Sequence, residues 1–254
     1  MNYFFNINNE RFSSEIQIPT FQNNGTTSKL INLYKCWPKN DSWIVEKIKK
    51  TEEESAFYLI SCNENTNSEI YFLAHPEELS NYDNLKLKKF NNFTDTSPSY
   101  RANLKIFMNK NTGFSSYQSE YPYSVASKKG TILSSVCSLG NKDAEKNFIF
   151  IKNIYEKPII EYFDAYLVNI KTQHIEEKFQ IKTNYTNCIE LHRKLIKPEI
   201  FLVTKDYLGI PIYVSLKDQH LSFEHTHPPH EYIVSENKFR KVAELKKEIN
   251  EIIN

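Results

Sequence analysis

Short apolar and aromatic runs, separated by polar stretches that mostly carry Asn or Asp, recur along most of the chain. Runs of this length, bounded by turn-forming residues, are typical of β-strands. In the N-terminal part, apolar residues at 4–5 and 16–18 could form short edge strands, and stronger predicted strands cover residues 30–37, 43–48, 57–62, 69–73 and 85–90. Beyond residue 100, predicted strands cover residues 103–108, 131–137, 147–152, 165–171, 178–183, 199–204, 210–216 and 220–227. The pattern therefore predicts a mainly β protein.

Helical periodicity is clear only at the C-terminal end. Ser235 can act as the N-cap, and one apolar stripe follows it, formed by Phe239, Val242, Leu245, Ile249 and Ile252. Lys and Glu fill the opposite face, as in a helix that packs with one side against a protein core. We therefore expect residues 235–254 to form an amphipathic helix that packs across the sheets. A helix used for dimerisation is the alternative.

The order of these elements favours one fold class. No regular helices are predicted between the strands, which argues against an open α/β sheet. The succession of strands instead indicates an antiparallel β-sandwich, immunoglobulin-like or jelly-roll, with an N-terminal β-rich region and one C-terminal amphipathic helix. The polar run at residues 91–99 is a candidate linker, although it is also compatible with an ordinary long loop. We expect a β-rich region over 1–95, the sandwich over 100–234 and the helix over 235–254.

Composition narrows the function classes. The 254 residues include 32 Lys and Arg against 31 Asp and Glu, a net charge of +1, whereas nucleic-acid binding usually needs a one-signed field. Only 5 glycines are present, which argues against Gly-rich phosphate loops. We find neither an apolar run of roughly 18 residues nor a signal-peptide pattern. The expectation is a soluble, cytoplasmic protein that neither binds nucleic acid nor inserts into a membrane.

The segment from Glu224 to Glu231 has the only spacing that suggests chemistry, because three of the chain's seven histidines fall within six residues. On a strand, His225 and His227 point to the same face, where both imidazoles can reach one metal ion. The Pro-Pro pair that follows holds the backbone extended, and His230 can turn back toward the pair. These three histidines are the predicted ligands of a Zn or Fe ion.

Two family patterns match parts of this segment. The spacing His225-x-His227-x-x-x-Glu231 resembles the first metal-binding motif of cupins, although the glycines that bracket that motif are absent here. The spacing His225-x-His227-x-x-His230 resembles that of the metallo-β-lactamase superfamily, with Pro229 in the place of the Asp that precedes the third histidine. Both resemblances imply a metal site. Beside such a metal, Glu231 could act as a general base toward a bound water.

A second candidate site combines tyrosines with a cation and a carboxylate. It comprises Arg101, Tyr117, Glu120 and Tyr121. Tyrosine rings stack against apolar faces of a ligand while polar tips fix its orientation, which suits sugar or peptide binding. Ordinary packing at strand edges is the alternative explanation for these tyrosines.

Two functional hypotheses follow from these residues. The first is an accessory or binding protein, with a site for a small molecule, a sugar or a protein partner near the segment 225–230. The second is a metal-dependent hydrolase or isomerase in which these histidines hold Zn or Fe. The first hypothesis ranks higher because no residue outside the segment has the spacing of a further metal ligand. A His-Pro-Pro-His turn that only closes a strand is the structural alternative.

Overall fold

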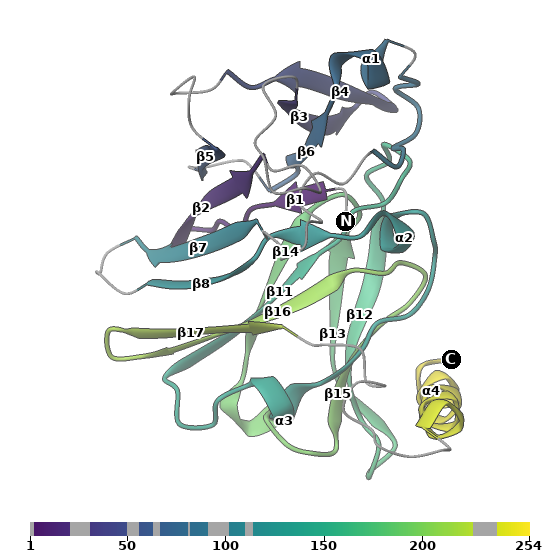
Figure 1. Ribbon diagram of the computed structural model, residues 1–254. Coiled ribbons are helices and arrows are strands. Elements are labelled where there is room, and N and C mark those ends of the chain that lie inside the picture. The colour runs from purple at the N-terminus through teal and green to yellow at the C-terminus, as the bar shows by residue number, and fades with distance from the viewer. Residues whose placement is uncertain are drawn as a thin grey trace.

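The computed structural model of the protein describes residues 3–20, 31–49, 56–62, 67–80, 82–90, 102–109, 114–225 and 238–254 (Figure 1). In these ranges the chain is mainly β, as the sequence predicts. The predicted two-sheet sandwich is wrong, because the strands form four small antiparallel sheets arranged like the blades of a four-bladed β-propeller. The physical reason is that period-two alternation fixes which face of a strand is buried but not which strands pair.

Sheets 1 and 2 contain most of the N-terminal half of the chain. Sheet 1 has the order β4 (Ser42–Lys47), β3 (Asn32–Lys39), β6 (Ile70–Ala74), β1 (Tyr3–Phe5) and β9 (Glu120–Tyr121). Sheet 2 has the order β5 (Phe57–Cys62), β2 (Phe12–Pro19), β7 (Asn103–Met108) and β8 (Phe114–Gln118). Both sheets pair strands from either side of residue 95, since β1 pairs with β9 and β2 with β7. The division into domains near that residue stays a prediction.

Sheets 3 and 4 contain the C-terminal strands. Sheet 3 has the order β14 (Thr186–Leu191), β11 (Lys146–Lys152), β16 (Ile210–Lys217) and β17 (His220–His225). Sheet 4 has the order β10 (Leu133–Ser135), β15 (Ile200–Thr204), β12 (Tyr162–Asn169) and β13 (His174–Lys182). The helices are α1 (Pro76–Leu79), α2 (Tyr123–Ala126), α3 (Val136–Leu139), a 3-10 turn (Arg193–Leu195) and α4 (Lys238–Ile253).

Several predicted strands differ from the structure. The segment 85–90 is an irregular loop whose Leu87 and Phe90 are nevertheless buried in the core, and the Leu87 N–H donates to the carbonyl of Glu156 (2.8 Å). Its apolar residues therefore serve packing without a strand partner. The predicted strand 131–137 is shorter, because the chain turns into α3 at Val136. The apolar spots at 4–5 and 16–18, expected to form short edge strands, instead lie in β1 and β2, each of which has a neighbouring strand on both sides in its sheet.

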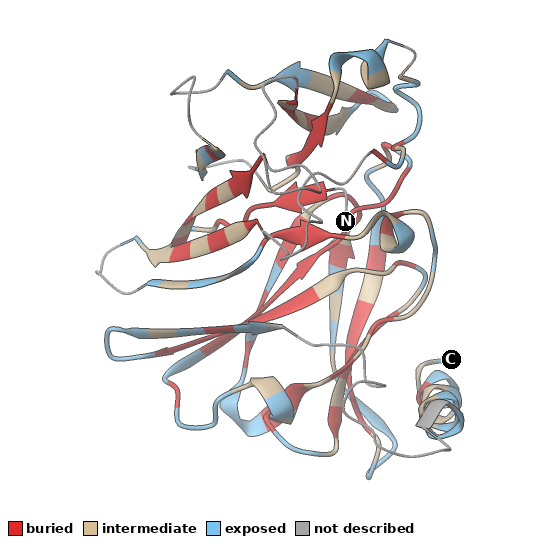
Figure 2. Cartoon of the chain, in the orientation of Figure 1, coloured by how far each residue is buried: buried red, intermediate tan, exposed pale blue. Residues whose placement is uncertain are grey.

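The largest core lies between sheet 3 on one side and sheets 1 and 2 on the other. On β2, alternate residues such as Phe12 and Ile16 are buried, as expected for a strand with one face inward. The ring of Phe12 meets the rings of Phe148 (5.4 Å) and Phe150 (5.9 Å) of β11 edge to face, a favourable geometry for aromatic pairs. The buried residues concentrate on the strands in the middle of the molecule (Figure 2).

A second core lies between sheets 3 and 4. Here Ile149 and Ile151 of β11 pack with residues of β12 and β15 such as Leu167 and Leu202. Since Phe148 and Phe150 belong to the first core and Ile149 and Ile151 to the second, both faces of β11 are buried. This explains its continuous apolar run, which is typical of a strand enclosed on both sides.

Polar contacts also join the sheets. Lys152, at the end of β11, is 0% exposed, and its ammonium donates to the carbonyls of Asn67 (3.1 Å) and Glu69 (3.3 Å) beside sheet 1. Trp43 of β4 is buried, and its indole N–H donates to the carbonyl of Glu156 (2.9 Å). Buried polar groups of this kind are stabilising only when their hydrogen bonds are made.

The predicted C-terminal helix is confirmed as α4. Leu245, Ile249 and Ile252 of its apolar stripe pack against the outer face of sheet 4, where Ile249 joins Tyr166, Val168 and Val203 in a third cluster. In Figure 1, α4 lies beside the lower part of the molecule, next to sheet 4. No helix in the described ranges is long and apolar enough to span a membrane.

Removal of the central apolar contact of α4 should destabilise the protein. We expect Ile249→Ala to lower the free energy of unfolding by about 2–4 kcal/mol, since a large buried side chain is replaced by a small one. Asn250→Ala, at the exposed neighbouring position, is the control and should change it by less than about 0.5 kcal/mol. Denaturant unfolding monitored by circular dichroism measures both. Equal stability of the two variants would contradict the docking of α4 on sheet 4.

Candidate functional site

Two edge strands from different sheets lie side by side, β8 of sheet 2 and β17 of sheet 3. In Figure 1 both run in the same direction, so their C-terminal ends, Gln118 and His225, lie at the same end of the pair. We call this feature the seam, comprising Phe114–Gln118 and His220–His225. It brings together the start of the histidine segment and part of the tyrosine-rich segment, which the sequence identifies separately.

The backbone register places two predicted site residues on facing sheets. Tyr117 pairs with Leu104 of β7, and His225 pairs with Ile212 of β16. Both partners, Leu104 and Ile212, belong to the core between sheets 2 and 3. In the registers of their sheets, positions 117 and 225 thus each lie directly opposite a core-facing residue, and the two sheets pack against each other. The side chains at these two positions lie outside the described part of the structure.

The described side chains of the seam divide into an apolar and a polar set. On β17, Phe223 is buried and Leu221 is half-buried against the core. The exposed polar residues are Ser116 and Gln118 on β8 and His220, Ser222 and Glu224 on β17. Hydroxyl, amide and carboxylate groups from two strands can donate and accept hydrogen bonds from a ligand. Because side chains alternate along a strand, these polar residues lie on the outer faces of the two strands, opposite to the core-facing positions.

The other residues of the predicted tyrosine site lie elsewhere. Glu120 and Tyr121 form β9 and are buried, and the Glu120 carboxylate accepts the backbone N–H of Ala102 (3.4 Å). Burial raises the pKa of Tyr121 well above its usual value, so its phenol stays protonated. Both side chains pack in the interior rather than at the seam surface, and their role in ligand binding stays a prediction. Arg101 lies outside the described residues.

The predicted metal site falls largely outside the described ranges. His227, His230 and Glu231 are not among the described residues. Within the ranges that are described, no group of three or more His, Cys, Asp or Glu residues is arranged to hold a metal ion. The Zn or Fe site at the histidine segment therefore stays a prediction.

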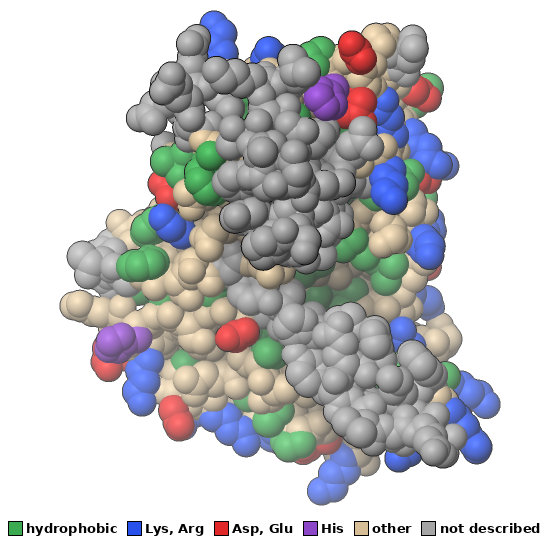
Figure 3. Space-filling view, viewed as in Figure 1, with side chains coloured by type: hydrophobic (Ala, Val, Ile, Leu, Met, Phe, Trp, Pro, Cys, Tyr) green, Lys and Arg blue, Asp and Glu red, His purple; other side chains and the backbone are tan. Residues whose placement is uncertain are grey.

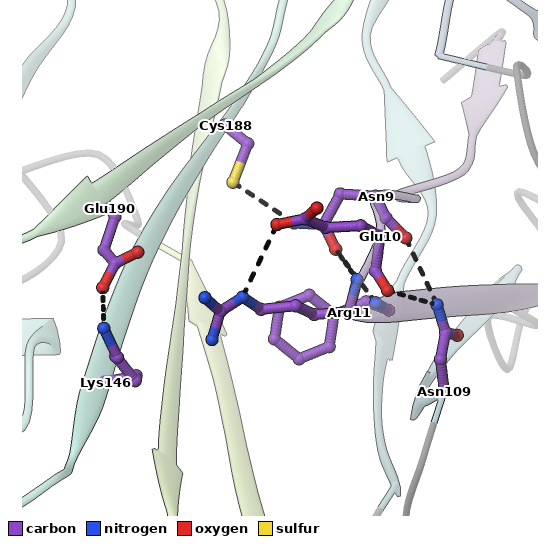
Figure 4. Close-up of polar contacts among 8 residues, drawn as sticks. Asn9, Glu10, Arg11, Asn109, Lys146, Cys188 and Glu190 are labelled. Carbon is purple, nitrogen blue, oxygen red and sulfur yellow. Dashed lines mark hydrogen bonds and ion pairs between the residues drawn. The ribbon is translucent and has the colours of Figure 1, made fainter.

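A polar cluster between sheets 2 and 3 was not predicted from the sequence (Figure 4). The Asn9 side-chain oxygen accepts the N–H groups of the residues two and three positions on (2.8 and 2.9 Å), which closes a turn before β2. The Asn109 amide donates to the carbonyls of Asn9 (3.3 Å) and Glu10 (3.1 Å). This turn holds the guanidinium of Arg11 5.5 Å from the ring centroid of Phe148, in the range of a cation–π contact.

Cys188 of β14 belongs to the same cluster. Part of this residue is exposed, but its sulfur accepts a hydrogen bond from the Asn9 amide (3.5 Å). Desolvation under the Asn9 turn raises the pKa of the Cys188 thiol to about 11. Nearby, Lys146 pairs with Glu190 and lowers the pKa of that carboxyl group. Because a nucleophilic cysteine needs a lowered pKa, this cluster is poorly suited to thiolate chemistry.

The sequence predicts the turn in this cluster but not the contact that the turn makes with Cys188. Asn9 before an apolar strand is a turn former that bonds its own backbone, so the turn itself was predictable. Its contact with Cys188 joins residues 179 positions apart, and no local pattern encodes it. The same limit applies to the seam, whose two strands are identified only once sheets 2 and 3 are placed.

Charge on the visible face agrees with the balanced composition. In Figure 3, acidic and basic side chains are interspersed over the described part of this face. Ion pairs join charges of opposite sign elsewhere in the described residues too, such as Lys105 with Glu15 (3.3 Å) and Lys35 with Glu46 (3.5 Å). A ligand at the described part of this face would thus meet local groups rather than a field of one sign.

Alkylation of Cys188 should reveal its raised pKa. In the folded protein, we expect its reaction with iodoacetamide to be slow at pH 8 and to accelerate up to about pH 11, because only the thiolate reacts. Mass spectrometry of the peptide that contains Cys188 measures the rate. In urea, the same residue should titrate near the usual value of about 8.5. Half-maximal reactivity near pH 8.5 in the folded protein would contradict the desolvated position.

The chain was compared with known protein families, curated proteins and solved structures. No protein-family model matches the chain, and neither does any curated protein or solved structure. The geometry of the described residues is therefore the basis for inferring a function.

Proposed function

We propose that the protein is a binding protein whose polar ligand, a sugar or a peptide segment of a partner, docks at the seam between β8 and β17. The observation that supports this most is the adjacency of the two edge strands. Each of them contains part of a candidate binding segment, and they come from different sheets. Binding sites are commonly formed where separate structural units meet.

The chemistry of the seam favours a ligand rich in hydroxyl or amide groups. Gln118 and Glu224 are exposed near the same end of the two strands, on the faces that point away from the core between sheets 2 and 3. A ligand that contacts both must therefore be elongated, as an oligosaccharide or a peptide is, and extend around the strand ends. Ser116 and Ser222 add hydroxyl groups further along the strands. A few polar groups of this kind fix the orientation of a bound ligand. The metal-dependent alternative is supported by the histidine spacing of the sequence alone.

Substitutions on the two strands should weaken binding of the same ligand. An array of immobilised neutral oligosaccharides and uncharged peptides supplies the probes, and calorimetry then measures the dissociation constant of each hit. We expect Gln118→Ala and Glu224→Ala each to weaken binding by roughly tenfold, the loss that follows removal of a hydrogen-bonding side chain. Asn250→Ala and Glu251→Ala, at exposed positions of α4, are matched controls that should bind as the unaltered protein does.

The outcomes separate the alternatives. Loss of binding in the variant of one strand only would exclude a shared site, and an unchanged dissociation constant in both would exclude the seam altogether. For the metal alternative, Zn²⁺ is added alone to protein purified without a His tag. Stoichiometric uptake that disappears in His225→Ala, with oligosaccharide and peptide binding absent, would favour the enzyme over the binding protein.

A further inference from the structure

The outer face of sheet 4 is covered by α4 over only part of its area. The apolar part around Val168 and Val203 packs against the helix. Towards the other end of β12, Tyr162 is 59% exposed and Ile160, just before the strand, is 48% exposed. Exposed aromatic and aliphatic side chains in one place often mark a contact surface.

Lysines and tyrosines are paired across this face in a repeated way. The strands β12 and β13 align Tyr162 with Lys182 and Tyr166 with Lys178. The ammonium of Lys182 lies 5.4 Å from the ring centroid of Tyr162, and that of Lys178 lies 5.5 Å from the ring centroid of Tyr166. Residues at even separations along a strand share a face, and the two pairs are four positions apart on each strand. They are therefore copies of one arrangement.

Among the described residues, a carboxylate completes one of the two copies. Asp164 accepts the ammonium of Lys178 (2.9 Å) and the hydroxyl of Tyr166 (3.0 Å). These contacts hold the pKa of Asp164 below its usual value, with the hydrogen bond from Lys178 as the largest cause. The Lys178–Tyr166 pair thus binds a carboxylate, and that carboxylate is the side chain of Asp164.

The second copy has the same cation and ring, but no carboxylate from the described part of the chain completes it. Lys182 forms no ion pair with a carboxylate of the described residues. Its ammonium is also 5.4 Å from the ring centroid of Tyr185, so it lies close to two tyrosines. A cation held in this way attracts an external carboxylate through charge-assisted hydrogen bonds.

We propose that the tyrosine–lysine patch, formed by Tyr162, Lys182, Tyr185 and Ile160, binds the carboxylate of an acidic sugar. The carboxylate would contact Lys182 as Asp164 contacts Lys178. The exposed ring of Tyr162 and the side chain of Ile160 suit the C–H face of a sugar ring, which is largely apolar. An acidic peptide offers the carboxylate without that ring, so the exposed apolar surface favours the sugar. This site is independent of the seam.

Binding of a defined acidic oligosaccharide tests the proposal. The probe is a galacturonic acid tetramer, compared by calorimetry with its carboxyl-reduced neutral counterpart and with a short poly-glutamate peptide. We expect the tetramer to bind and the neutral sugar not to bind. Lys182→Met and Tyr162→Ala should each weaken binding by roughly tenfold or more, and added salt should weaken it further. Thermal unfolding checks that both variants remain folded.

Lys178→Met is the matched control, because it removes a lysine from the same strand and face. This variant, and Gln118→Ala at the seam, should keep the affinity of the unaltered protein for the tetramer. Absence of tetramer binding, equal binding of the neutral sugar, or equal losses in Lys182→Met and Lys178→Met would overturn the proposal. Poly-glutamate binding as tight as that of the tetramer would also overturn it, in favour of an acidic peptide ligand.

Discussion

The burial of sheet 3 on both faces is the constraint on which the rest of the structure depends. Phe148 and Phe150 of β11 face sheet 2, whereas Ile149 and Ile151 face sheet 4. Because one strand supplies both cores, sheet 3 connects sheets 1 and 2 with sheet 4. The seam exists for the same reason, since β17 is the edge of sheet 3 and meets β8 where the layers pack.

The sequence predicts local elements better than their assembly. The apolar stripe of α4 and the apolar run of β11 can be predicted from the sequence, because helix and strand periodicities are local properties. The four-sheet arrangement was not, because its defining pairs join distant segments, as when β1 pairs with β9. Leu87 and Phe90 show the other limit, since an apolar residue can be buried from a loop as well as from a strand. The sandwich was therefore a reasonable prediction from the strand pattern, and a wrong one.

The candidate sites divide in a similar way. Residue chemistry drew attention to Tyr117 and His225, but only the fold shows that their strands are neighbours. Glu120 and Tyr121 follow in the same segment, yet they are buried in β9 because the chain crosses from sheet 2 to sheet 1 there. The patch at Lys182 was missed, since its repeat of tyrosine and lysine depends on the register between two strands. Register is a property of the pair and not of either sequence.

The buried ammonium of Lys152 has a consequence for how the molecule unfolds. Two of its hydrogen-bond acceptors are backbone carbonyls next to sheet 1, whereas its own strand is central in sheet 3. If sheet 1 opened alone, a cation would remain inside the protein without those carbonyls, which is far more costly than exposing apolar surface. Partial opening at this junction is therefore disfavoured, and sheets 1 and 3 should behave as a single cooperative unit in hydrogen exchange.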